Sequence, residues 1–275
     1  MPAFIGLILI IGVTVPVAAW LGRRERLDLS PTPWDLADVA RRQIPMLSGA
    51  AAISITAIVL LVTLVRNQST TESPAFDTVL TMFLIAFISF VALAIELVFM
   101  PLEGGVEGES LPRLLSTIAG VQHYRTLLLA WLALKPLMDT FGLEAPATLL
   151  LWLLGVAALA GWLIVSSICS RMGVLRPREA FVLPVIGISL GWMFSLAVFG
   201  RPGGGSGTEN LLALTLAIFV LNTMTFGAHA LLPMLHRHRS GVRWIEHFGH
   251  TYVLFDLQAT VVAISLLWHA LLQPY

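Results

Sequence analysis

Carboxylates beside long apolar segments are the residues of this sequence with the clearest chemical potential. We interpret Glu96 as the lone carboxylate within the membrane. It is followed by Pro101 and by an acidic segment that contains Glu103, Glu107 and Glu109. Ionisable groups are costly within hydrocarbon, so they mark ion paths or contacts with partners. The acidic residues therefore favour one of these two roles.

Basic residues form a second group of interest. Lys135, the only lysine of the chain, is expected at the end of a helix, and Arg171, Arg176 and Glu179 lie between two later helices. Lysine can also extend its ammonium group to the membrane surface as a passive anchor. For Lys135 the functional and the passive interpretation both stay open.

Long apolar segments must hold these residues in place. The chain of 275 residues is 57% hydrophobic and only 12% charged, and apolar segments of about 20 residues, enough to cross a bilayer as a helix, recur along it. The alternating pattern of a barrel strand is absent. We therefore predict an all-α, polytopic bundle of eight spans: residues 3–22, 46–65, 78–100, 114–136, 146–169, 180–199, 210–235 and 251–272.

Arginine placement predicts the orientation of these spans. The loops after spans one, five and seven hold most of the arginines, and such loops belong on the cytoplasmic side. Eight spans with both termini outside satisfy this rule. The formal net charge is zero, with no basic tail, which argues against a nucleic-acid partner. The basic residues of these loops are Arg23, Arg24, Arg26, Arg41, Arg42, Arg171, Arg176, Arg178, Arg237, Arg239 and Arg243.

The first cytoplasmic loop carries a helix-start signal. Thr32 is a candidate N-cap, Pro33 suits the first helical position, and Asp35 suits the third. Pro45 should limit continuation into the next span. We predict a short surface helix here, separate from the span that follows.

Enzymatic motifs are not evident. Gly187, Ser189 and Gly191 match the sequence pattern of a nucleophile elbow, but they lie within a predicted span rather than at a strand-to-helix turn.

The single Cys169 excludes an internal disulfide and a cysteine-bound metal cluster. Histidines near the spans leave haem or metal ligation as minor alternatives, although no four-ligand set can be assembled. We expect no catalytic residue and no metal site. The histidines in question are His123, His229, His247, His250 and His269.

Two segments on the predicted cytoplasmic side resemble a known family. Asp35, followed after six residues by Arg42 and Gln43, is similar to the first loop of membrane subunit 1 of respiratory complex I and of its counterparts in energy-converting hydrogenases and formate hydrogenlyases. Glu96, followed by Pro101 and further glutamates, resembles the acidic loop of that family.

Two further segments continue the resemblance in the same order. Gly120 followed by Lys135 is similar to the family's Tyr-Ser-Gly and Leu-Lys stretches. The segment from Ser170 to Phe181, with Arg171 and Arg176, resembles the stretch before the family's last span. The resemblance implies a non-catalytic subunit of an oxidoreductase complex in a bacterial inner membrane.

The resemblance also implies roles for particular residues. Proton relay would fall to Glu96, Glu103, Glu107, Glu109 and Lys135. Docking of a soluble iron–sulfur or nickel–iron redox arm, beside other membrane subunits, would fall to Asp35, Arg42, Gln43, Arg171, Arg176 and Glu179. This chain itself would bind no cofactor, with quinone as the one possible exception.

The chain departs from the family pattern both within this region and after it. It lacks room for two of the family's spans, and residues 201–275 continue past the family's usual end. We therefore divide it into a domain like those of complex I and hydrogenases, residues 1–200, and a two-helix segment, residues 201–275. Two alternatives stay open, a stand-alone secondary transporter and a structural assembly protein of the membrane.

Overall fold

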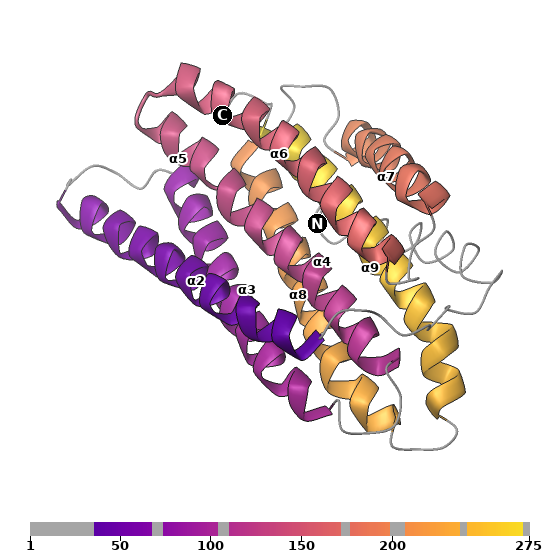
Figure 1. The fold of residues 1–275 in the computed structure, drawn as a ribbon. Helices are drawn as coiled ribbons and strands as arrows, with labels where there is room; N and C mark the ends of the chain where they lie inside the picture. The colour runs from indigo at the N-terminus through magenta and orange to yellow at the C-terminus, as the bar shows by residue number, and fades with distance from the viewer. Residues whose placement is uncertain are drawn as a thin grey trace.

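The computed structural model describes residues 36–67, 74–103, 110–171, 177–198, 207–236 and 241–271. All regular structure within these ranges is helical, which confirms the all-α prediction. The helices form an elongated bundle in which α2 and α7 occupy opposite edges (Figure 1). In chain order they are α2 (Leu36–Asn67), α3 (Pro74–Glu103), α4 (Ser110–Leu132), α5 (Leu134–Thr140), α6 (Glu144–Arg171), α7 (Pro177–Val198), α8 (Gly207–His236) and α9 (Gly241–Leu271).

Four of the described helices contain segments long and apolar enough to cross a bilayer. These are Arg41–Thr63 in α2, Phe76–Leu97 in α3, Glu144–Ser167 in α6 and Thr251–Trp268 in α9. Helix α8 contains a shorter apolar stretch, Leu214–Ala228. The described part of the chain thus has the character of a membrane protein. The count of eight spans and the placement of the termini stay predictions, and the first predicted span lies outside the described residues.

The predicted surface helix before Pro45 is not a separate element. Helix α2 runs from Leu36 through Pro45 to Asn67 without interruption. Proline removes one backbone donor from a helix, but a membrane helix can tolerate this loss where neighbouring groups compensate. The prediction was wrong because it treated Pro45 as a helix boundary. The capping residues proposed before Leu36 lie outside the described residues.

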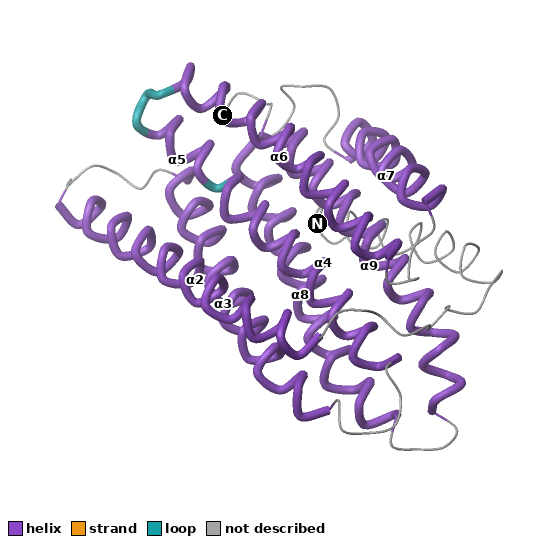
Figure 2. The backbone as a smooth tube through the Cα atoms, viewed as in Figure 1, coloured by secondary structure: helices purple, strands orange, loops and turns teal. Residues whose placement is uncertain are grey.

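The predicted fourth span is divided in two. Helix α4 ends at Leu132 and α5 begins at Leu134, where Pro136 has no N–H to continue the hydrogen-bond ladder. Helix α5 ends in a turn with Gly142 at φ 72°, a left-handed conformation that favours glycine. The N–H of Leu143 then bonds to the carbonyl of Met138 over 3.0 Å, which closes the turn. Figure 2 shows this short connection between α5 and α6.

The bundle has a large apolar core that encloses a cluster of polar side chains, and its outer surface is also apolar. Helix α9 packs against α4, α7 and α8, and α3 packs against α2, α4 and α8. Helix α6 exposes large apolar side chains such as Trp152, Leu153 and Val156, whereas arginine, asparagine, aspartate and threonine side chains are buried between α4, α8 and α9. This distribution suits helices that face lipid and use polar contacts to hold one another.

A glycine in α7 sets the distance between α7 and α9. A Cβ at Gly187 would lie 2.6 Å from Cγ1 and 2.9 Å from Cβ of Val261, closer than such atoms can approach. We expect Gly187→Ala to lower the free energy of unfolding by about 1–3 kcal/mol through overpacking. Unfolding in detergent micelles, followed by circular dichroism, measures the effect.

Gly227 of α8 provides the matched control. A Cβ at Gly227 would meet nothing within 4 Å. Alanine is favoured over glycine inside a helix, so Gly227→Ala should leave stability unchanged or raise it by up to about 1 kcal/mol. Equal stability of the two variants would show that α7 does not depend on close contact with α9.

Candidate functional site

A fully buried arginine lies at the centre of the bundle. Arg125 of α4 has no exposed surface. Its Nη1 donates to Asp256 Oδ1 over 2.6 Å and to Thr260 Oγ1 over 2.8 Å, both in α9. Its Nε donates to Asn222 Oδ1 over 2.7 Å, and its Nη2 donates to Thr225 Oγ1 over 3.0 Å, both in α8. One side chain therefore joins three helices.

Asp256 supplies the buried countercharge. Its side chain is 2% exposed, and its Oδ1 accepts the hydrogen bond of Arg125. The second carboxylate oxygen, Oδ2, is also buried and has no hydrogen-bond partner among the described residues. Tyr252 lies one helical turn earlier in α9 and has a side-chain hydrogen bond with Thr225. A carboxylate and a phenol thus adjoin the guanidinium group.

Asn222 extends the cluster to α3. Its Nδ2 donates to Ser89 Oγ over 2.8 Å and to Thr126 Oγ1 over 3.2 Å, while its Oδ1 accepts from Arg125. We name this set of side chains the Arg125 cluster. It comprises Ser89, Arg125, Thr126, Asn222, Thr225, Asp256 and Thr260. The connections between α3, α4, α8 and α9 fix the relative positions of the four helices.

Glu96 lies close to the Arg125 cluster. It follows Ser89 by two turns of α3, is 7% exposed, and lies beside the side chain of Gln122 in α4. Its carboxylate interacts electrostatically with both Arg125 and Asp256. The proton-relay residue predicted from the sequence is therefore part of a larger buried polar region.

The interpretation of Glu96 as the lone membrane carboxylate is wrong. Asp256 is a second carboxylate, and it lies within a segment able to cross a bilayer. Glu96 was selected by the rule that a charged residue in an apolar helix is a functional candidate. The same rule also selects Arg125 and Asp256. The sequence signal was present for all three, but the pairing of Arg125 with Asp256 depends on a contact between distant helices.

Lys135, also predicted as a relay residue, has a local partner. It forms an ion pair with Asp139 one turn later in α5. Both side chains are mostly buried, at 12% and 19% exposed. Such a pair within one helix stabilises it modestly. Glu103 ends α3, but its side chain, Glu107 and Glu109 lie outside the described part of the chain, so their relay roles stay predictions.

The predicted docking residues fall near the ends of several helices. Near the start of α2, Arg42 is exposed and Gln43 is half-buried. Glu179 is half-buried in the first turn of α7. Arg171 ends α6, but its side chain is not among those described, and Asp35 and Arg176 lie outside the described residues. The docking roles therefore stay predictions.

The histidines add little to the described site. His123 of α4 contacts the ring of Phe90 edge to face, with ring centroids 6.4 Å apart, which indicates a packing role. No group of three or more histidine, cysteine, aspartate or glutamate side chains suited to a metal ion occurs among the described residues. The side chains of His229, His247, His250 and His269 are not described.

Helices α8 and α9 supply much of the candidate site. The sequence left the contribution of residues 201–275 open, and the structure places Asn222, Thr225, Asp256 and Thr260 around Arg125. Comparisons with protein-family models, with curated proteins and with solved structures found no match to this chain. The functional argument therefore depends on the site itself.

Proposed function

We propose that this protein is a non-catalytic membrane subunit of a redox complex resembling complex I or an energy-converting hydrogenase, and that it helps to couple electron transfer to proton translocation. The observation that supports this role best is the buried polar region formed by Glu96, Gln122 and the Arg125 cluster. Charged and polar side chains buried within apolar helices are functional candidates by default.

The residues of this region divide by the chemistry that each can perform. A guanidinium group does not lose its proton in proteins, so Arg125 acts as a fixed positive charge. Glu96 is the carboxylate that this proposal assigns to proton exchange, and both Glu96 and Asp256 lie within the electrostatic influence of Arg125. In this proposal, movement of a charge at one end of the bundle changes the proton occupancy of Glu96.

Helix ends of the bundle offer a position for a soluble partner. The N-terminal ends of α2 and α4 and the C-terminal end of α3 lie toward one end of the bundle (Figure 1). The exposed Arg42 belongs to this end. This arrangement agrees with a common side for the docking residues and the acidic segment. In this proposal the redox arm binds at this end of the bundle. Glu96 then gains or loses a proton in response to the change of charge in the redox arm.

The docking part of the proposal predicts weaker assembly when basic residues are neutralised. Arg171→Ala combined with Arg176→Ala should lower recovery of the soluble partner about tenfold. This factor corresponds to a loss of roughly 1.4 kcal/mol of interaction free energy between the two proteins. The experiment is affinity purification of the tagged protein from native membranes, followed by quantification of each partner. The pair Lys135→Ala and Asp139→Ala is the control, and equal recovery from both double variants would contradict the docking role.

The same purification tests the proposed function as a whole. The wild-type protein should be recovered with a partner that contains iron–sulfur or nickel centres, as determined by metal analysis. Membrane vesicles that hold the complex should translocate protons when the partner's electron donor is added. Recovery of the protein without a redox partner would reject the proposal.

One feature of α7 favours a second candidate, a stand-alone secondary transporter. Gln258 is buried, and its side-chain amide forms two hydrogen bonds with α7 when its oxygen and nitrogen are oriented to match the groups around them. It then donates to the carbonyl of Leu183 over 3.1 Å and accepts from the N–H of Gly187 over 3.1 Å. Pro184, between these two positions, has no N–H. A side chain of α9 thus bonds to backbone groups of α7 beside a proline; transporters have interrupted helices at such positions, whereas α7 itself runs without a break. Substrate-driven proton uptake by the purified protein alone in liposomes would favour this function.

A further inference from the structure

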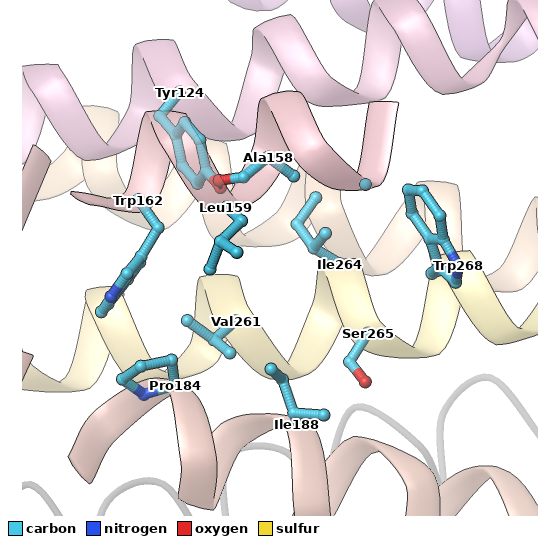
Figure 3. Close-up of a pocket in the computed structure, with 11 residues that line it drawn as sticks. Tyr124, Ala158, Leu159, Trp162, Pro184, Ile188, Val261, Ile264, Ser265 and Trp268 are labelled. Atoms are coloured by element: carbon cyan, nitrogen blue, oxygen red, sulfur yellow. Dashed lines mark hydrogen bonds between the residues drawn. The ribbon is translucent and has the colours of Figure 1, made fainter. Parts of the chain in front are cut away.

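An apolar groove lies between α4, α6, α7 and α9, apart from the Arg125 cluster. It has a volume of about 230 Å³. Trp162 and Trp268 lie toward its two ends, with Leu159, Val261 and Ile188 between them (Figure 3). The polar region around Glu96 does not use these residues.

Close contacts with glycines fix the aromatic walls of the groove. A Cβ at Gly155 would lie 2.9 Å from Cη2 of Trp268, and a Cβ at Gly161 would lie 2.7 Å from Cε2 of Tyr124. The two rings therefore rest directly against the backbone of α6. The Tyr124 hydroxyl also donates to the carbonyl of Ala158 over 2.6 Å. The groove is thus formed by side chains that are already held in place, which lowers the entropic cost of binding.

The lining restricts the chemistry of an occupant. Aliphatic and aromatic side chains make up most of the surface, and the hydroxyl of Tyr124 is already bonded to Ala158. Ser265 is the other hydroxyl residue of the lining. Apolar cavities of this kind stay dry and accept apolar molecules. A charged or strongly polar ligand would find too few partners here.

The length and direction of the groove match a hydrocarbon chain. Its wall on α6 extends from Gly155 to Trp162, which is about 10 Å at a rise of 1.5 Å per residue. These residues belong to Glu144–Ser167, a segment able to cross a bilayer. The groove therefore runs along a transmembrane direction, as the acyl chains of a bilayer do.

The groove is continuous with the apolar outer surface of the bundle. Leu159 and Ile188 line it and are also 60% and 47% exposed. On the neighbouring turns of α6, Val156 and Leu163 are exposed as well. A lipid chain can thus enter sideways from the surface that faces the membrane. The geometry points to a binding site for one acyl chain of a bilayer phospholipid between α6 and α7.

Photocrosslinking tests this site in the intact protein. The probe is a phosphatidylcholine with a diazirine in its acyl chain, included in nanodiscs of unlabelled phosphatidylcholine. After illumination, mass spectrometry should find adducts concentrated on Leu159, Ile264 and Ser265. Ile188→Trp should fill the groove and lower these adducts about tenfold, equivalent to a loss of roughly 1.4 kcal/mol of binding free energy. Val185→Trp, on the same helix but outside the groove, should leave them unchanged.

A second measurement does not depend on the variants. Native mass spectrometry of the wild-type protein should detect a retained phospholipid after detergent washing. Adducts spread evenly over the exposed face of α6, no retained phospholipid, or occupation by an isoprenoid in place of phospholipid would each overturn the site. The result is independent of the proposed redox function, because it requires only that these helices lie in a membrane.

Discussion

Replacing Asp256 by alanine is expected to lower the free energy of unfolding by about 3–5 kcal/mol, the typical cost of leaving a buried charge without its partner. Arg125 has no exposed surface, and Asp256 provides its buried countercharge at 2.6 Å. Arg125 would still donate to the hydroxyl and amide oxygens of Thr260, Thr225 and Asn222, but these groups carry no negative charge. Unfolding of the purified protein in mixed micelles, monitored by circular dichroism, measures the loss.

Three further variants distinguish a buried charge from a general loss of packing. Asp139→Ala removes the ion pair with Lys135 inside α5 and should cost less than Asp256→Ala, because the partly exposed Lys135 can extend its ammonium group to solvent or the membrane surface. Asp256→Asn keeps an acceptor for Arg125 and should cost less than alanine. The double replacement Arg125→Met and Asp256→Leu removes both charges and should recover much of the lost stability. Equal stability of the Asp256→Ala and Asp139→Ala variants would contradict the central role of the pair.

Helix type was predictable because long apolar runs leave few alternatives, whereas helix boundaries were not. A bilayer permits only structures that satisfy their own backbone hydrogen bonds, so the apolar segments had to be helical. The two prolines at positions 45 and 136 had opposite effects. Helix α2 continues through Pro45, and the predicted fourth span breaks just before Pro136. Proline removes one donor in both cases, and tertiary contacts decide whether the helix continues.

The candidate site was predictable in part. Glu96 was found because a carboxylate in an apolar segment is conspicuous, and its burial agrees with that choice. Arg125 and Asp256 carry the same signal but are 131 residues apart. Their pairing depends on α4 and α9 lying side by side, which no local pattern encodes. Asn222 and Thr225 carry no charge, so only the structure shows that they bind Arg125.

Proton movement should depend on the ability of Glu96 to exchange a proton. Replacement by glutamine preserves the size of the side chain and its contact with Gln122, but it removes the carboxylate. We expect Glu96→Gln to lower redox-driven proton translocation on the order of 10²-fold, the lower range of effects seen when a positioned proton-transfer group is lost. Assembly with the redox partner and electron transfer should continue. A fluorescent pH indicator in membrane vesicles measures the first quantity, and donor oxidation measures the second.

The design of this experiment separates a relay from a structural role. Glu144→Gln is the control, because Glu144 is an exposed carboxylate in the first turn of α6. Glu96→Asp keeps a carboxylate at nearly the same position and should retain part of the translocation, whereas a purely steric role would make aspartate the worse replacement. The ratio of protons moved to electrons transferred is therefore decisive. A normal ratio in Glu96→Gln would exclude Glu96 from the path, and a ratio lowered only in Glu96→Asp would assign it to packing between α3 and α4.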